Sequence, residues 1–194
     1  MECPNRVRFV LVLAFTTMLF GCRSADQHRE SSIEKDMWSF SYDSADVGLA
    51  KEWFSPSYDR SGWRTTTSGY WPEVNGDQVE GIGWYASSFN VADSSAPLSM
   101  YFGGIDDEGT IWINGQRYGT HAQYDEPFVL DLHGLRWGGN SVVVRVVNRG
   151  GPGGLYEPVR LVKTSDVNKL IKSKFADENA RESAEWVRNG AAKF

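Results

Sequence analysis

Cysteine and histidine are scarce in this sequence, and acidic residues outnumber basic ones by 25 to 20. Its two cysteines, Cys3 and Cys22, are too few for the disulfide framework of a small secreted domain. Nothing in the formal net charge of −5 at pH 7 suggests nucleic acid, whose binding would require a basic face. There is no G-x-S-x-G motif, and the three histidines have no partner at a metal-ligand spacing. We therefore expect no nucleic-acid partner, no metal, no cofactor and no catalytic nucleophile, and a fold stabilised by its apolar core.

Long hydrophobic runs are also lacking, apart from "FVLVLAFTTMLF" between Phe9 and Phe20. That run is shorter than the roughly 20 residues that span a bilayer. It follows Arg6 and Arg8 and precedes "LFGC", which is the layout of a secretory signal. A small residue followed at once by cysteine resembles the bacterial lipobox, which implies acylation of Cys22. The alternative is an ordinary signal peptide that carries a cysteine.

The composition divides the chain into four segments. Residues 1–21 are the expected lipoprotein signal peptide, and residues 22–36 are a polar stretch without periodicity, typical of a flexible tether. Residues 37–163 are rich in aromatic and turn residues and form the expected domain. Residues 164–194 contain almost no glycine or proline and many helix formers, which predicts a helical extension.

From Met37 onward the apolar residues alternate with a period of two, as they do in half-buried strands. Short runs of this kind, separated by turn residues, are typical of an all-β antiparallel sandwich. The predicted inward-facing sets are Trp38, Phe40 and Tyr42; Tyr85, Phe89 and Val91; Leu98, Met100 and Phe102; Phe128, Leu130 and Leu132; and Val142, Val144 and Val146.

The stretch "IDDEGTIWINGQRYGTH" contains the best-defined turn and a cluster of acidic residues. Asn114-Gly115 favours the positive φ angles of a type I′ hairpin. The acids Asp106 and Asp107 are adjacent, and consecutive strand residues point to opposite faces, so they are poorly placed to act as a catalytic pair. Their spacing also differs from that of an EF-hand loop. We expect the cluster to be structural, with short acidic side chains accepting backbone N–H groups.

Four motifs in order resemble the sugar-binding domain of glycoside hydrolase family 2 and of related β-galactosidases. They are "GIGWYASSFNV", "LSMYFGGIDDEGTIWINGQRYGTH", "PFVLDL" and "GGNSVVVRVVNRGGPGGLYEPVRLV". The resemblance extends from Trp38 to Val162 and implies a galactose-binding-like jelly roll. In that family the catalytic glutamates lie on a separate TIM barrel of about 200 residues or more. We therefore expect this chain not to be an enzyme, because fold does not carry function with it.

The resemblance implies a carbohydrate partner, such as a β-galactoside or a plant or algal polysaccharide. Such a site would combine an aromatic face with polar groups on loops. One candidate group is the long loop before the "GIGW" strand, with Asp77 and Glu80 as acceptors. Trp71 is either the stacking ring of this group or a core residue that caps the sandwich. The candidates are Tyr70, Trp71, Asn75, Asp77 and Glu80 from that loop, and Tyr124, Asp125, Arg149 and Tyr156 from two later loops.

Two functions from different classes are compatible with this sequence. The first is a lipid-anchored carbohydrate-binding or accessory module of the bacterial cell envelope, on the periplasmic face or the outer surface. The second is a structural or assembly lipoprotein that binds a protein partner and no sugar. The C-terminal helical extension, where Val167, Leu170, Ile171 and Phe175 recur at helical spacing, is the predicted partner-binding element.

Overall fold

A computed structural model describes residues 37–71, 80–91 and 96–190. These residues form eleven strands, one 3₁₀ helix and one α-helix. The strands are β1 (Met37–Tyr42), β2 (Arg64–Thr67), β3 (Gly69–Tyr70), β4 (Gly81–Val91), β5 (Leu98–Phe102), β6 (Glu108–Ile113), β7 (Gln116–His121), β8 (Phe128–Leu132), β9 (Gly138–Asn148), β10 (Gly154–Leu155) and β11 (Val159–Lys163). The helices are η2 (Thr164–Asp166) and α1 (Val167–Gly190).

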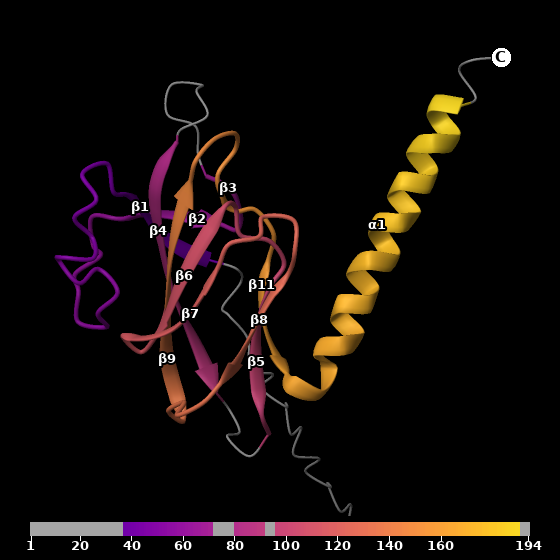
Figure 1. The fold of residues 1–194 in the computed structure, drawn as a ribbon. Coiled ribbons are helices and arrows are strands. Elements are labelled where there is room, and N and C mark those ends of the chain that lie inside the picture. Colours follow the sequence, from indigo (N-terminus) through magenta and orange to yellow (C-terminus); the bar gives the residue numbers. More distant parts are fainter. Residues whose placement is uncertain (1–36, 72–79, 92–95, 191–194) are drawn as a thin grey trace, which may run out of the picture.

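The strands build two main antiparallel sheets that face each other (Figure 1). The larger sheet has the order β2-β1-β4-β9-β6-β7, and the smaller has the order β11-β5-β8. A short pair, β10-β3, forms a third ladder. All paired strands are antiparallel, so the predicted all-β antiparallel sandwich is confirmed.

The main core lies between the two sheets and follows the period-two pattern of the sequence. In β4, for example, Tyr85, Phe89 and Val91 are buried in this core. The five predicted inward-facing sets all belong to it, with Tyr42, Phe128 and Leu130 partly buried at its margin. Burial of an apolar side chain contributes about 1.5–3 kcal/mol. Alternation therefore gives each strand the side chains that hold the sheets together.

A second apolar cluster lies on the outer face of the six-stranded sheet. Trp84, Trp112 and Val143 come from three neighbouring strands and point away from the main core. They are covered by the segment 43–63 between β1 and β2, which supplies Trp53 and Phe54. The rings of Phe54 and Trp112 stack with centroids 5.2 Å apart. The aromatic richness of the chain thus serves two clusters, one on each face of this sheet.

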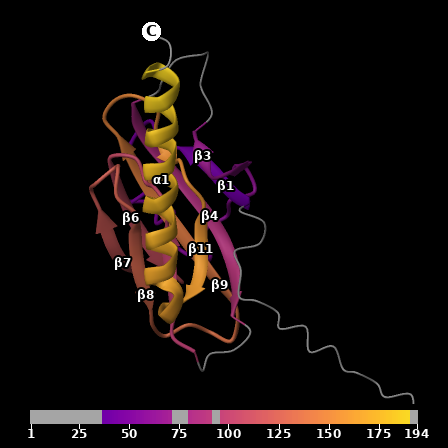
Figure 2. The same cartoon turned by 90° about the vertical axis from the view of Figure 1, so that its right-hand side faces the viewer.

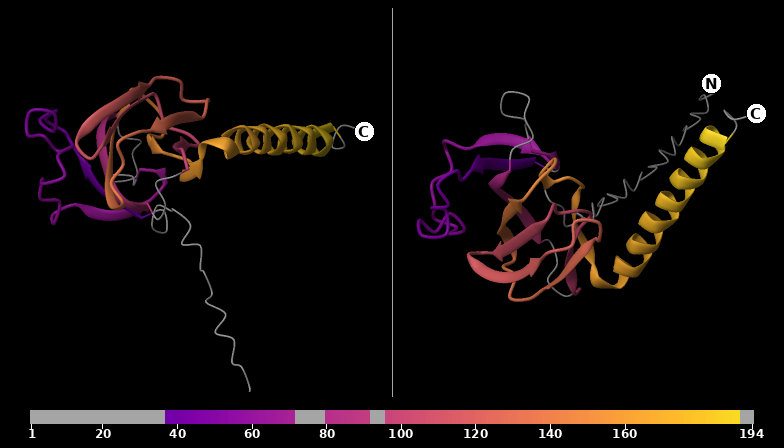
Figure 3. Two further views of the ribbon diagram at one scale, coloured as in Figure 1. Left: turned by 90° about the horizontal axis from the view of Figure 1, so that it is seen from below. Right: turned by 45° about the horizontal axis from the view of Figure 1, so that its top comes forward.

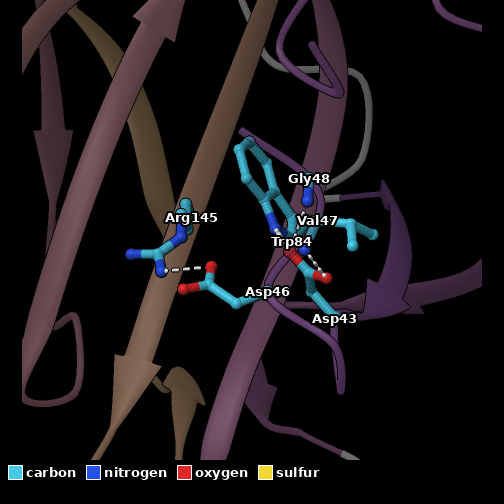
Figure 4. A network of polar contacts seen from close by, with 6 residues as sticks. All are labelled: Asp43, Asp46, Val47, Gly48, Trp84 and Arg145. Carbon is cyan, nitrogen blue, oxygen red and sulfur yellow. Dashed lines mark hydrogen bonds and ion pairs between the residues drawn. The ribbon is translucent and has the colours of Figure 1, made fainter. Parts of the chain in front are cut away.

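A buried carboxylate fixes the beginning of segment 43–63 (Figure 4). Asp43 is 3% exposed and accepts hydrogen bonds from the backbone N–H groups of Val47 and Gly48, both over 2.8 Å. It also accepts one from the indole Nε1 of Trp84, over 3.0 Å. Nearby, Arg145 of β9 pairs with Asp46 over 2.9 Å. Bonds of this kind satisfy a buried charge and tie the segment to the sheet.

The β6–β7 turn has the predicted geometry. Asn114 and Gly115 both have positive φ, of 51° and 83°, as a type I′ turn requires. The side chain of Asn114 also binds the adjacent strand, because its Oδ1 accepts the N–H of Ser141 over 3.0 Å. This turn therefore joins two strands and braces a third.

The chain leaves the sandwich through η2 and continues as α1. Figures 1, 2 and 3 show α1 starting beside the end of β11, crossing in front of the smaller sheet and diverging from it. Its contact with the sandwich includes Lys174, whose Nζ donates to the carbonyl of Gly103 over 2.6 Å. Within the described residues, no helix has the length and apolar character needed to cross a membrane.

Candidate functional site

A cleft of about 480 Å³ lies where several loops converge at one end of the sandwich. Its walls come from β3, the segment before β6, the β7–β8 loop, the loops on either side of β10, and α1. The lining residues are Tyr70, Asp106, Asp107, Tyr124, Asp125, Gly150, Pro152, Tyr156, Glu157 and Lys174. Tyrosines and carboxylates therefore dominate the surface that a ligand would meet.

Two tyrosine rings from distant parts of the sequence form the aromatic wall. The rings of Tyr70 and Tyr156 stack with centroids 5.9 Å apart and an interplanar angle of 15°. Tyr156 packs against Gly104, where a Cβ would collide with its ring. Its hydroxyl donates a hydrogen bond to the carbonyl of Tyr124. Burial, followed by the nearby Glu157, raises the pKa of Tyr156 to about 12, so it remains a neutral donor at physiological pH.

Tyr70 and Tyr124 present most of their surface to solvent. Tyr70 is 62% exposed and Tyr124 is 60% exposed, whereas buried tyrosines pack within the core. The phenol ring of Tyr70 is held in place by its stack with Tyr156. A pre-positioned, exposed ring of this kind loses little conformational entropy when a ligand packs against it.

Two residues of the acidic cluster contribute to the lining of the cleft. Asp106 and Asp107 lie in a bend before β6 and both line the cleft. The sequence argument that they point to opposite faces is wrong, because Asp107 adopts a left-handed φ of 45° and the pair precedes the strand. The expected structural role is present as well: Asp107 accepts the backbone N–H of Arg149 over 2.5 Å, and Asp106 accepts that of Asp107 over 3.0 Å.

One oxygen of the Asp106 carboxylate, Oδ2, is buried without a hydrogen-bond partner among the described residues. Burial, and secondarily the charge of Asp107, raise the pKa of Asp106. A positive charge in the cleft would stabilise the ionised carboxylate through space, because the unpartnered oxygen itself is buried.

An ion pair closes the side of the cleft toward α1. Lys174 of α1 lies 3.3 Å from the carboxylate of Glu157, which follows Tyr156 in the chain. The side chain of Lys174 is only 11% exposed. This contact, together with its bond to Gly103, makes α1 part of the site.

The structure brings together four of the predicted site residues and separates others. Tyr70, Tyr124, Asp125 and Tyr156 all line the cleft. Arg149 lies beside it, where its guanidinium pairs with Glu108 over 2.7 Å. The exposed residue Glu80 has its carboxylate near Gly150, which is a cleft residue.

The predicted stacking role of Trp71 is wrong. Its side chain is 4% exposed and belongs to the main core. The indole packs against the rings of Phe40 and Tyr42, with centroids 6.3 and 5.6 Å away, and covers Gly83. It therefore presents no free face to a sugar. Asn75 and Asp77, the other predicted residues of this loop, lie outside the described residues, as does Cys22.

Sequence reasoning missed several residues of the cleft. The sequence predicts only a structural role for Asp106 and Asp107 and does not single out Glu157 or Lys174, although all four line the cleft. The adjacency of Glu157 to a predicted tyrosine was a usable signal. Nothing in the sequence indicated that Lys174 of the helix would reach the same place. No group of three or more histidine, cysteine, aspartate or glutamate side chains in the described ranges is arranged to hold a metal ion.

Comparison with known proteins gives a consistent result. A putative beta-glucuronidase from Formosa agariphila is 34% identical over 95 residues, which cover 44% of this chain and 9% of that protein. A glycosyl hydrolase family 2 member from Bacteroides cellulosilyticus is 26% identical, with a TM-score of 0.56 over 66% of this chain and 20% of its own. The resemblance to glycoside hydrolase family 2 is confirmed. A beta-glucuronidase from an uncultured Clostridium is 20% identical and shares the fold, with a TM-score of 0.59 over 68% of this chain and 29% of its own.

These matches concern a small part of each relative. The chain spans 9% of the length of the curated relative and between 20% and 29% of the two structures named above. No family model matches the chain. The similarity therefore shows a domain like that of family 2 glycoside hydrolases, and the activity of the whole relatives is not transferred with it.

Proposed function

We propose that residues 37–163 form a non-catalytic carbohydrate-binding module. The observation that carries this proposal is the cleft in which the exposed ring of Tyr70 stacks on Tyr156 and four carboxylates share the lining. Sugars present C–H faces that pack on aromatic rings and hydroxyl groups that donate to carboxylates. The cleft offers both kinds of contact at one place, on loops supported by a rigid sandwich.

The binding role is proposed in place of hydrolysis because of the extent of the similarity. The chain matches 20–29% of the hydrolase structures named above, and the family resemblance puts the catalytic glutamates on a separate barrel. Two of the four carboxylates that line the cleft are already engaged, since Asp107 accepts the N–H of Arg149 and Glu157 pairs with Lys174. We expect no turnover of aryl glycosides by this chain.

The proposed location is the bacterial cell envelope, with the module anchored by lipid on Cys22. This part of the proposal rests on "LFGC" and the preceding apolar run. A tether of residues 22–36 would then let the cleft sample glycans near the membrane surface. Either the periplasmic face or the outer surface fits the proposal.

The test of the proposed function is direct binding. The full chain, purified in a detergent without a sugar head group, should bind members of a glycan array, and calorimetry should give a saturable isotherm for the best of them. Absence of binding to any glycan at millimolar concentration would overturn the proposal. Hydrolysis of aryl glycosides by the purified chain would overturn its non-catalytic part.

A second candidate function is favoured by the helix. α1 diverges from the smaller sheet (Figures 1 and 3), and Phe175 on it is 44% exposed. A helix that carries an exposed aromatic residue can dock that residue in an apolar groove of a partner. In this alternative the protein is an assembly lipoprotein that binds another protein through α1 and binds no sugar. The glycan experiment above distinguishes the two functions.

A further inference from the structure

We infer that the cleft selects sugars that carry a protonated amine, such as glucosamine units, and rejects sugars that carry a carboxylate. This inference rests on the proposed carbohydrate-binding function and adds the class of ligand to it. The structural basis is the combination of exposed tyrosine faces with an excess of carboxylates in one cleft.

The lining of the cleft is strongly acidic. Four carboxylates line it, from Asp106, Asp107, Asp125 and Glu157, and a single cation, Lys174, accompanies them. A concave site with one sign of charge focuses the field and raises the local concentration of ligands of opposite charge. An anionic sugar entering this cleft would meet like charges at short range, at an unfavourable Coulomb energy.

The cations near the cleft are already engaged. Lys174 donates to the carbonyl of Gly103 and lies against Glu157, and its side chain is 11% exposed. The guanidinium of Arg149 pairs with Glu108 over 2.7 Å. A uronate carboxylate would therefore have to break one of these contacts to gain a cationic partner.

An ammonium group finds suitable partners in the same cleft. The exposed faces of Tyr70 and Tyr124 attract a cation through the ring quadrupole. Asp125 is exposed and lines the cleft, so its carboxylate can contact the ammonium group directly. Asp106 also lines the cleft, and its charge attracts the cation through space, because its unpartnered oxygen is buried. A cation in the cleft stabilises both carboxylates, and the sugar ring to which it belongs packs on the stacked tyrosines.

This preference differs from the one suggested by the names of the relatives. A beta-glucuronidase is named for a sugar that carries a carboxylate, and two of the three similar proteins described above bear that name. The charge of this cleft opposes such a ligand. The similarity of fold and the selectivity of the cleft are therefore separate properties.

The experiment compares three probes of equal length against the full chain in a non-glycosidic detergent. They are β-1,4-linked oligomers of glucosamine, of N-acetylglucosamine and of glucuronic acid, titrated by calorimetry at a slightly acidic pH where the amine is protonated and the carboxyl groups are ionised. At low ionic strength we expect the glucosamine oligomer to bind at least about tenfold more tightly than the uronate. High salt should reduce this ratio, because it screens the charges.

Two variants separate the cleft from the overall charge of the protein. Asp125→Asn removes one charge from the rim of the cleft and should lower the ratio by about threefold or more. Glu52→Gln removes the same charge from segment 43–63, on the opposite side of the sandwich from α1 (Figure 1), and should leave the ratio unchanged. Both residues are exposed, so neither change should impair folding.

Each outcome has a definite meaning. Tightest binding of the glucosamine oligomer, with a smaller ratio in Asp125→Asn only, supports the inference. Equal or tighter binding of the neutral or uronate oligomer overturns the inference and leaves the proposed sugar site intact. An equal effect of the two variants overturns it as well, because the preference would then arise from general charge. Failure of all three oligomers and of a glycan array to bind overturns the proposed function itself.

Discussion

Tyr70 and Trp71 are neighbours in the chain, yet one faces the solvent and the other the core. Tyr70 is 62% exposed and Trp71 is 4% exposed. The backbone N–H of Trp71 donates to the carbonyl of Gly153 over 2.7 Å, which fixes the chain at this point. Because successive residues of an extended chain point to opposite sides, anchoring Trp71 inside places Tyr70 in the cleft. We therefore expect substitution of Trp71 to lower the stability of the fold, and substitution of Tyr70 to lower the affinity for sugar.

Trp71→Ala should destabilise the fold. The indole packs among Phe40, Tyr42 and Gly83 in the main core. Truncation of a buried tryptophan leaves a cavity and costs on the order of 3–5 kcal/mol of unfolding free energy. Chemical denaturation followed by tryptophan fluorescence or circular dichroism measures this loss. A free energy of unfolding within about 1 kcal/mol of the wild type would show that Trp71 is not a core residue.

Asp43→Asn should destabilise the segment that covers the second apolar cluster. The carboxylate accepts three hydrogen bonds (Figure 4), and an amide can supply only one oxygen for them. At least one buried donor then faces an NH₂ group, at a cost on the order of 1–3 kcal/mol. Thermal unfolding of the variant should show a lower midpoint.

The matched control for Asp43 is Asp46→Asn, in the same segment. The side chain of Asp46 is 60% exposed and accepts one hydrogen bond, from Arg145, whose own side chain is 12% exposed. Asparagine keeps an oxygen that can accept this one bond, so the change should cost less than Asp43→Asn, which breaks a set of three bonds. Equal midpoints of thermal unfolding for the two variants would show that the hydrogen bonds of Asp43 do not stabilise segment 43–63.

Gly115→Val should weaken the β6–β7 hairpin. Gly115 has a φ of 83°, where a β-branched residue is strained, and a Cβ there would lie 2.8 Å from Cδ of Pro56. We expect a loss on the order of 1–3 kcal/mol. The control is Gly62→Val, because a Cβ at Gly62 meets nothing within 4 Å. Equal stability of the two variants would contradict the turn geometry.

Cys22→Ala tests the proposed anchor. If the "LFGC" motif is processed as a lipobox, the variant should either be released from membranes or accumulate as an uncleaved precursor. Fractionation with a detergent that separates lipidated from soluble proteins gives the result. A variant that is processed normally and still partitions with the detergent phase would exclude Cys22 as the lipid anchor.

The sheets could be predicted from the sequence because their signal is local. Alternation in β4 and β9 identified the inward-facing residues Tyr85, Phe89, Val142 and Val144, and all four are buried in the main core. The Asn114-Gly115 turn was equally local. Period-two patterning and turn chemistry each depend on residues that are adjacent in the chain.

The cleft was only partly predictable, because distant segments build it. The sequence identifies Tyr70, Tyr124 and Tyr156 as aromatic loop residues, but only tertiary packing stacks Tyr70 on Tyr156. Trp71 was misplaced because a short extended segment gives no periodicity from which to choose the inward side. Lys174 was missed because its role depends on where α1 lies against the sandwich.

The most direct test of the account is the effect of Tyr70→Ala on sugar binding. With the best glycan from the array, calorimetry should show a loss of about tenfold or more in affinity, on the order of 1–3 kcal/mol for a well-placed aromatic. The free energy of unfolding should change little, because Tyr70 is exposed. Trp137→Ala, a control at the opposite end of β9 where the indole is 82% exposed, should leave both quantities unchanged. Unchanged affinity in Tyr70→Ala, or an equal loss in Trp137→Ala, would contradict the assignment of the cleft as the sugar site.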